Sequence, residues 1–82
     1  DENERRGFRK DQCGAWIRWQ DYGNRDSVYG WEVHHVVPES MGGSDALTNL
    51  IPLHWKSNVA TSDSPRLYCA VRSNGNSNVA VG

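Results

Sequence analysis

Residues 31–63 read WEVHHVVPESMGGSDALTNLIPLHWKSNVATSD, and this stretch decides the fold. Two adjacent histidines, His34 and His35, lie near the end of one apolar segment, and Asn49 opens a second one after a glycine-containing turn. Asn58 follows on a segment that we expect to be helical. A histidine pair and two carboxamides around one turn can hold a cation beside a general base, so the stretch indicates a hydrolytic site.

The pattern in this stretch predicts a strand, a loop, a second strand and a helix. Residues 29–37 are rich in Tyr, Trp and Val, which favours a strand, and Pro38 ends it because proline has no amide hydrogen to donate. Residues 39–45 form a loop in which two glycines let the chain reverse. Residues 48–53, interrupted by a proline, predict an edge strand, and the helix begins near His54.

Further segments flank this unit on both sides. Residues 13–20 predict a strand, and residues 1–10 a frayed arm or a short helix. Residues 66–71 predict either a strand or an extended arm. Residues 73–82 are poor in bulky side chains, which predicts a mobile tail. We therefore expect one α+β domain over residues 1–72, followed by a flexible tail.

Composition describes a small domain with many aromatic side chains. The 82 residues include four tryptophans, three tyrosines and one phenylalanine, each of which can bury a large apolar area. A hydrophobic core is therefore possible, although a domain of this size often needs a metal, a crosslink or a partner as well. We expect Trp16, Trp31 and Trp55 to be core residues rather than platforms for stacking bases.

The net charge of −1 argues against a protein that coats nucleic acid by charge alone. The charge is uneven, because residues 5–25 carry six basic side chains and only two acidic ones. The basic ones are Arg5, Arg6, Arg9, Lys10, Arg18 and Arg25. Contacts to phosphate would come from this segment, and a solvated surface without a ligand explains the same charges equally well.

The two cysteines, Cys13 and Cys69, are far apart and form no CxxC pair, so a cysteine-based zinc knuckle is excluded. Their separation is compatible with a disulfide. In a reducing cytosol such a pair more often consists of small buried apolar groups, and we expect reduced, structural cysteines. No apolar run approaches transmembrane length, and we expect a cytoplasmic protein without a membrane partner.

Hydrolysis of a phosphodiester bond needs a cation at the phosphate oxygens and a base that deprotonates water, and histidine can serve either purpose. Successive side chains of a regular strand point to opposite faces, so His34 and His35 can share one site only if the strand twists or ends there. Asn49 can fix which ring nitrogen of a histidine is free. Asn58 and His54, four residues apart, would share one face of the helix.

The motifs HHVVP, GGSDALTNLIPL and HWKSNVATSD resemble the HNH endonuclease family of the ββα-metal superfamily. The resemblance is closest to the variant whose third signature residue is asparagine. In that variant the middle asparagine follows fifteen residues after the first member of the pair, and the last asparagine nine residues later. Positions 34, 49 and 58 have the same spacings, and the similarity extends over residues 9–63.

The resemblance implies a small ββα-metal fold, in which a metal-site helix packs on an antiparallel hairpin, with an additional N-terminal strand or arm. It implies metal-dependent hydrolysis of phosphodiester bonds in DNA. In this reading His34 and Asn58 bind the metal, His35 is the general base, and Asn49 orients that base.

One departure from the family pattern bears on the metal. The variant commonly has aspartate where this chain has His34, and imidazole suits Zn²⁺ and Ni²⁺ as well as Mn²⁺. We expect one divalent cation, Mg²⁺ or Mn²⁺ first and Zn²⁺ or Ni²⁺ as alternatives. Ser57 and Asn58 stand where some relatives have cysteine and histidine, so a structural zinc is not expected.

Three further residues, Arg18, Lys56 and His54, are weaker candidates for contacts to nucleic acid. His54 has the alternative of capping or filling the start of the helix. Two other hypotheses compete with the nuclease. One is a module on the same fold that binds nucleic acid or protein without cutting, as one part of a larger protein with other domains. The other is a structural domain stabilised by a Cys13–Cys69 bridge.

Overall fold

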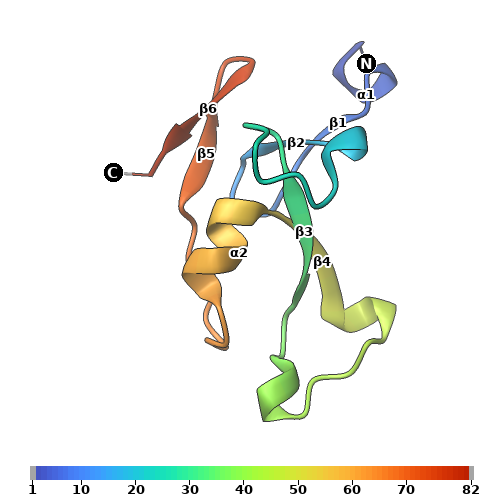
Figure 1. Cartoon of the computed structure of the whole chain (residues 1–82), viewed down its shortest axis with the longest axis vertical. Coiled ribbons are helices and arrows are strands. Elements are labelled where there is room, and N and C mark those ends of the chain that lie inside the picture. Colours follow the sequence, from blue (N-terminus) through green and yellow to red (C-terminus); the bar gives the residue numbers. More distant parts are fainter. Residues whose placement is uncertain (1, 82) are drawn as a thin grey trace.

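A long antiparallel hairpin forms the centre of the molecule (Figure 1). The computed structural model describes residues 2–81. The hairpin consists of β3 (Trp31–His35) and β4 (Leu50–His54), and α2 (Trp55–Thr61) follows β4 directly and packs beside it. This is the expected ββα unit, and the predicted α+β class is confirmed.

The register of the hairpin fixes where the predicted site residues lie. His34 stands opposite Ile51 and His35 opposite Leu50, so the histidine pair occupies the end of β3, as the strand-end interpretation requires. Pro52 lies inside β4, opposite Val33. The proline is tolerated because the sheet has only two strands and each has a free edge.

The loop between β3 and β4 is shaped by two 3₁₀ turns and two glycines. The turns are η2 (Glu39–Met41) and η3 (Leu47–Asn49). Gly42 has a φ of 84°, and a Cβ added to Gly43 would lie 1.7 Å from the carbonyl oxygen of Val37. Both glycines therefore serve the turn, as expected.

The N-terminal part forms the short helix that was one of the two expectations, and not a frayed arm. It has a short helix, α1 (Glu2–Arg5), and a strand, β1 (Phe8–Lys10), which pairs with β2 (Trp16–Arg18). The 3₁₀ turn η1 (Trp19–Asp21) follows, so the strand expected over residues 13–20 is shorter than predicted. Asp1 of the expected arm and Gly82 of the expected tail lie outside the described residues.

The C-terminal segment differs from the expected mobile tail. It forms a second hairpin from β5 (Val71–Asn74) and β6 (Ser77–Ala80). The turn contains Gly75 with a φ of 63°, after an asparagine, which is a common turn signal. The Asn78 carboxamide ties the hairpin to the body by accepting from Trp16 N and donating to Trp16 O, both at 2.8 Å.

The core is small and unusually polar. The buried hydrophobic residues of the described chain are Ala15, Ile17, Leu53 and Val71, and the buried polar ones are Asp11, His34, His54, Ser57 and Thr61. The tryptophans expected to form the core are half-buried at its edge, and a fourth, Trp19, is 74% exposed. Hydrogen bonds therefore replace part of the expected apolar packing. No helix within residues 2–81 is long and apolar enough to cross a membrane.

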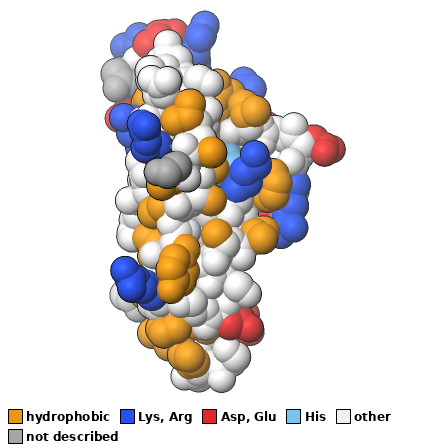
Figure 2. Space-filling model, turned by 90° about the vertical axis from the view of Figure 1, so that its left-hand side faces the viewer, with side chains coloured by type: hydrophobic (Ala, Val, Ile, Leu, Met, Phe, Trp, Pro, Cys, Tyr) orange, Lys and Arg blue, Asp and Glu red, His pale blue; other side chains and the backbone are white. Residues whose placement is uncertain are grey.

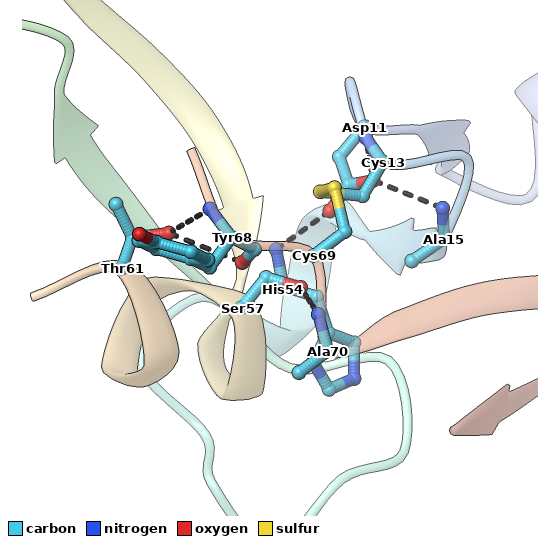
Figure 3. The surroundings of a disulfide bond; sticks show 9 residues. All are labelled: Asp11, Cys13, Ala15, His54, Ser57, Thr61, Tyr68, Cys69 and Ala70. Carbon is cyan, nitrogen blue, oxygen red and sulfur yellow. Dashed lines mark hydrogen bonds between the residues drawn. A yellow bond between two sulfur atoms is a disulfide. The ribbon is translucent and has the colours of Figure 1, made fainter. Parts of the chain in front are cut away.

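Figure 3 shows the disulfide between Cys13 and Cys69, whose Cα atoms are 5.5 Å apart. This corrects the expectation of reduced cysteines. The bridge joins the turn before β2 to the segment before β5, and hydrogen bonds from α2 hold the same segment. Ser57 Oγ accepts from Ala70 N at 3.0 Å, and Thr61 Oγ1 bonds both Tyr68 N and Tyr68 O. A crosslink of this kind is common where a small core alone is marginal.

Removing the bridge should lower the free energy of unfolding substantially. The bond closes a loop with a sequence separation of 56, for which chain entropy gives about 4 kcal/mol. We expect the Cys13→Ala, Cys69→Ala double variant to unfold at a much lower urea concentration than the oxidised protein, as followed by tryptophan fluorescence. Equal midpoints for the two proteins would show that the bridge does not stabilise the fold.

Candidate active site

The end of β3, the loop after it and α2 line a cleft of about 180 Å³. Its lining residues are Val33, His34, His35, Pro38, Glu39, Asn58, Ser62 and Asp63. The cleft contains three of the four predicted site residues. The fourth, Asn49, does not line it.

His34 and Asn58 are in direct contact across the hairpin and the helix. His34 Nδ1 lies 2.9 Å from Asn58 Oδ1, and the His34 residue is only 6% exposed. The contact forms because α2 starts immediately after β4, so its first turns lie over the strand that pairs with β4. Both side chains therefore come from regular elements rather than from the loop.

The geometry of this pair fits two ligands of one divalent cation. Two ligand atoms at right angles around an octahedral ion, each about 2.1 Å from it, lie about 3.0 Å apart. His34 Nδ1 and Asn58 Oδ1 form a hydrogen bond of 2.9 Å in this structure, and the same separation is close to the distance between two such ligand atoms. An imidazole nitrogen and a carboxamide oxygen are donors that Mn²⁺ and Mg²⁺ can accept, and the nitrogen also suits Zn²⁺ or Ni²⁺.

His35 is held by two carboxylates that the sequence did not single out. Its Nε2 lies 2.8 Å from Asp45 Oδ1 and 3.4 Å from Glu39 Oε1. An ionised carboxylate only accepts hydrogen bonds, so the neutral imidazole carries its proton on Nε2. The lone pair is then on Nδ1, which is the atom that can accept a proton from water.

His35, Glu39 and Asp45 also form a second group of potential cation ligands. One donor atom from each lies within 4.8 Å of the others. The carboxylate side chains are 72% and 87% exposed, which makes this group more open to water than the buried His34. An ion bound there would occupy the histidine that the family resemblance assigns as the base.

Asn49 acts on the backbone of the loop and not on a histidine ring. Its Nδ2 donates to Ser44 O at 2.8 Å and to Val37 O at 3.1 Å, and its Oδ1 accepts from Val37 N at 2.8 Å. These bonds clamp the two ends of the loop together. Because Asp45 follows Ser44, Asn49 can orient His35 only indirectly, through the loop that carries Asp45.

Two residues that the sequence analysis did not single out as site residues, Glu32 and Arg25, support the site. Glu32, on β3, accepts a hydrogen bond from Asn58 Nδ2 at 2.9 Å and is paired with the Arg25 guanidinium at 2.8 and 3.0 Å. The hydrogen bond from Arg25 lowers the pKa of the Glu32 carboxyl below its ordinary value. The period of two along a strand could have found Glu32, since it shares a face with His34.

Two of the weaker candidates for nucleic-acid contacts, Arg18 and Lys56, lie over aromatic rings. The Arg18 guanidinium lies 5.5 Å from the centre of the Phe8 ring, and Lys56 Nζ lies 5.5 Å from the centre of the Trp55 ring. On the face that carries α2, β5 and β6, basic side chains are scattered among hydrophobic ones and form no continuous band (Figure 2).

His54 has the capping role rather than a place at the cleft. It is 2% exposed, and it precedes α2 instead of lying within it. Its Nδ1 accepts from Lys56 N at 3.1 Å, and its Nε2 bonds Val28 O at 3.0 Å. The expectation that it shares a helical face with Asn58 is thereby corrected, because the chain enters the helix only at Trp55.

Comparison with known proteins identifies the family. The family model described as HNH endonuclease matches residues 12–64, which is more than half of the chain. The chain belongs to the HNH endonuclease family. This HNH chain is also similar to a protein named "Probable mobile endonuclease C" from Enterobacteria phage T4, with 53% identity over 32 residues. That match covers 39% of this chain and 15% of the phage protein, and no solved structure gave a significant match. The assignment to the asparagine variant remains a prediction.

The buried position of His54 predicts a pH dependence of stability. Burial lowers the pKa of this imidazole below its ordinary value of 6.5, so the unfolded chain binds a proton at a higher pH than the folded one. The free energy of unfolding should therefore be highest above that value and should fall as the pH drops through and below it. In urea titrations we expect this fall to be smaller in His54→Gln than in the unsubstituted protein. An identical pH dependence in both would contradict this role of His54.

Proposed function

We propose that this chain is a divalent-cation-dependent endonuclease domain that hydrolyses phosphodiester bonds in DNA. The observation that carries the proposal is the cleft in which His34, His35 and Asn58 meet, in a chain of the HNH endonuclease family. In this proposal His35 is the general base, and His34 and Asn58 are the cation ligands.

His35 has the environment that a general base needs. With Nε2 donating to Asp45, the Nδ1 atom is left to remove the proton from an attacking water molecule. The same hydrogen bond, 2.8 Å long, fixes the orientation of the imidazole ring. Asn49 supports this arrangement by holding the loop through Val37 and Ser44.

His34 and Asn58 supply one nitrogen and one oxygen donor for the cation. A bound divalent cation would stabilise the negative charge that develops on the leaving oxygen. Mg²⁺ and Mn²⁺ are the first candidates, and Zn²⁺ and Ni²⁺ the alternatives, because one donor is an imidazole.

DNA is the proposed substrate. The phage protein that this chain resembles is named an endonuclease, and the chain spans only 15% of its length. We propose that other domains of a larger protein supply part of the DNA binding. Within this chain, Arg18 and Lys56 are the proposed phosphate contacts.

Loss of the base should abolish most cleavage. We expect the protein with Mg²⁺ or Mn²⁺ to nick or linearise plasmid DNA, and His35→Ala to be slower by about 10² to 10⁴-fold, the usual contribution of a general base. Met41→Ala, an exposed residue of the same loop, is the matched control and should retain activity. Equal cleavage by the unsubstituted protein and His35→Ala would exclude the catalytic role of His35.

The alternative is a module on the same fold that binds nucleic acid or protein without cutting. The near-neutral charge and the histidine at position 34 favour it. The two functions differ in metal binding. Our proposal expects saturable heat when Mn²⁺ is titrated into the protein, and its loss in Asn58→Ala but not in Asn76→Ala, an exposed turn residue. The non-catalytic module without a cation site gives no such heat in any of the three.

A further inference from the structure

Glu32 lies on the same face of β3 as His34, because strand side chains two residues apart point in one direction. That face is turned toward α2, where Glu32 contacts Asn58. Its side chain is 20% exposed, compared with 57% for its partner Arg25. Glu32 is therefore a half-buried carboxylate in direct contact with the proposed cation ligand Asn58.

The Glu32 carboxylate is held in place by a two-point ion pair. Arg25 Nε lies 2.8 Å from one carboxylate oxygen, and the second guanidinium nitrogen lies 3.0 Å from the other. A bidentate pair of this kind fixes orientation as well as distance. The Arg25 guanidinium is itself placed over the Trp55 ring at 5.7 Å, so it is anchored to the first turn of α2.

The Asn58 carboxamide has two ends of similar size and opposite chemistry. Its Nδ2 donates to Glu32 Oε1 at 2.9 Å, and its Oδ1 faces His34 Nδ1 at 2.9 Å. A carboxylate can only accept hydrogen bonds, so the nitrogen end must face Glu32. The oxygen end is then directed at His34, and oxygen is the only end that can bind a hard divalent cation.

We propose that Glu32, held by Arg25, is a positioning residue that fixes the Asn58 carboxamide with its oxygen toward His34 and so makes Asn58 a cation ligand. The proposal rests on the proposed function, in which His34 and Asn58 bind the cation. A glutamine in place of Glu32 can present either its oxygen or its nitrogen to Asn58, so the Asn58 amide can turn over and present its own nitrogen, which cannot bind the ion. Glu32 then determines cation affinity without contacting the cation.

The test compares Mn²⁺ affinity by calorimetry in two backgrounds. In the unsubstituted protein, we expect Glu32→Gln to weaken Mn²⁺ binding by about 10 to 100-fold, as is usual for residues that support metal ligands. Glu2→Gln, which removes the same charge from an exposed pair with Arg6, is the matched control and should leave the affinity unchanged.

The second background is Asn58→Asp, whose carboxylate presents an oxygen in either orientation. There Glu32→Gln should not weaken Mn²⁺ binding, because no amide remains to be oriented. A simple attraction between the Glu32 charge and the cation would instead weaken binding in both backgrounds. That result, or an unchanged affinity in the first background, would overturn the proposal.

A further variant guards against a failure to fold. Glu32→Asp keeps the charge but draws the carboxylate away from Asn58, and it should also weaken Mn²⁺ binding. Urea unfolding without metal measures the structural effect of each substitution separately. If the unsubstituted protein binds no Mn²⁺, the proposed function fails and this proposal fails with it. If it binds Mn²⁺ and neither Glu32 variant differs from it, only the role of Glu32 is overturned.

Discussion

The rest of the structure depends on the hydrogen bonds that the buried carboxylate of Asp11 accepts. Its Oδ1 accepts from Cys13 N and Ala15 N, and its Oδ2 accepts from His54 N, all at 2.9 Å. One side chain therefore shapes the turn that carries the disulfide and fixes the residue from which α2 begins. The start of α2 in turn sets where Asn58 lies against His34. A buried donor that is left without a partner costs about 1 to 3 kcal/mol. Loss of the Asp11 carboxylate would remove the acceptor of three backbone N–H groups, those of Cys13, Ala15 and His54.

One part of the candidate site lies on regular elements, and the other part lies on a loop. His34 and Asn58 project from a strand and a helix that are joined directly, and Glu32 supports them from the same strand. His35 is the last residue of β3. The carboxylates that contact it belong to the loop that Asn49 holds together. Ligand atoms need fixed separations, whereas a base must accommodate water and a phosphate. The division of the site between regular elements and a loop suits these two requirements.

The sequence predicted the parts of the fold that depend on periodicity and spacing. The hairpin and the helix after it followed from strand and helix patterning, and the meeting of His34 with Asn58 followed from the resemblance to the HNH endonuclease family. The C-terminal hairpin was missed. The Cys13–Cys69 bridge was named only as an alternative to reduced cysteines, and helix capping only as one of several roles for His54. Each depends on contacts between distant segments, such as Asn78 with Trp16 or Asp11 with His54. A tail of small polar residues can be ordered by one carboxamide and one Asn-Gly turn, and composition does not reveal this.

The most direct test of cation binding by His34 and Asn58 is a crystal structure of the protein soaked with Mn²⁺, with the ion located by its anomalous scattering. We expect a peak within coordination distance of the His34 ring nitrogen and Asn58 Oδ1, with the Asn58 nitrogen still donating to Glu32. A peak enclosed instead by His35, Glu39 and Asp45, with His34 still hydrogen-bonded to Asn58, would contradict this expectation. In that case His35 would be a ligand and could not be the base.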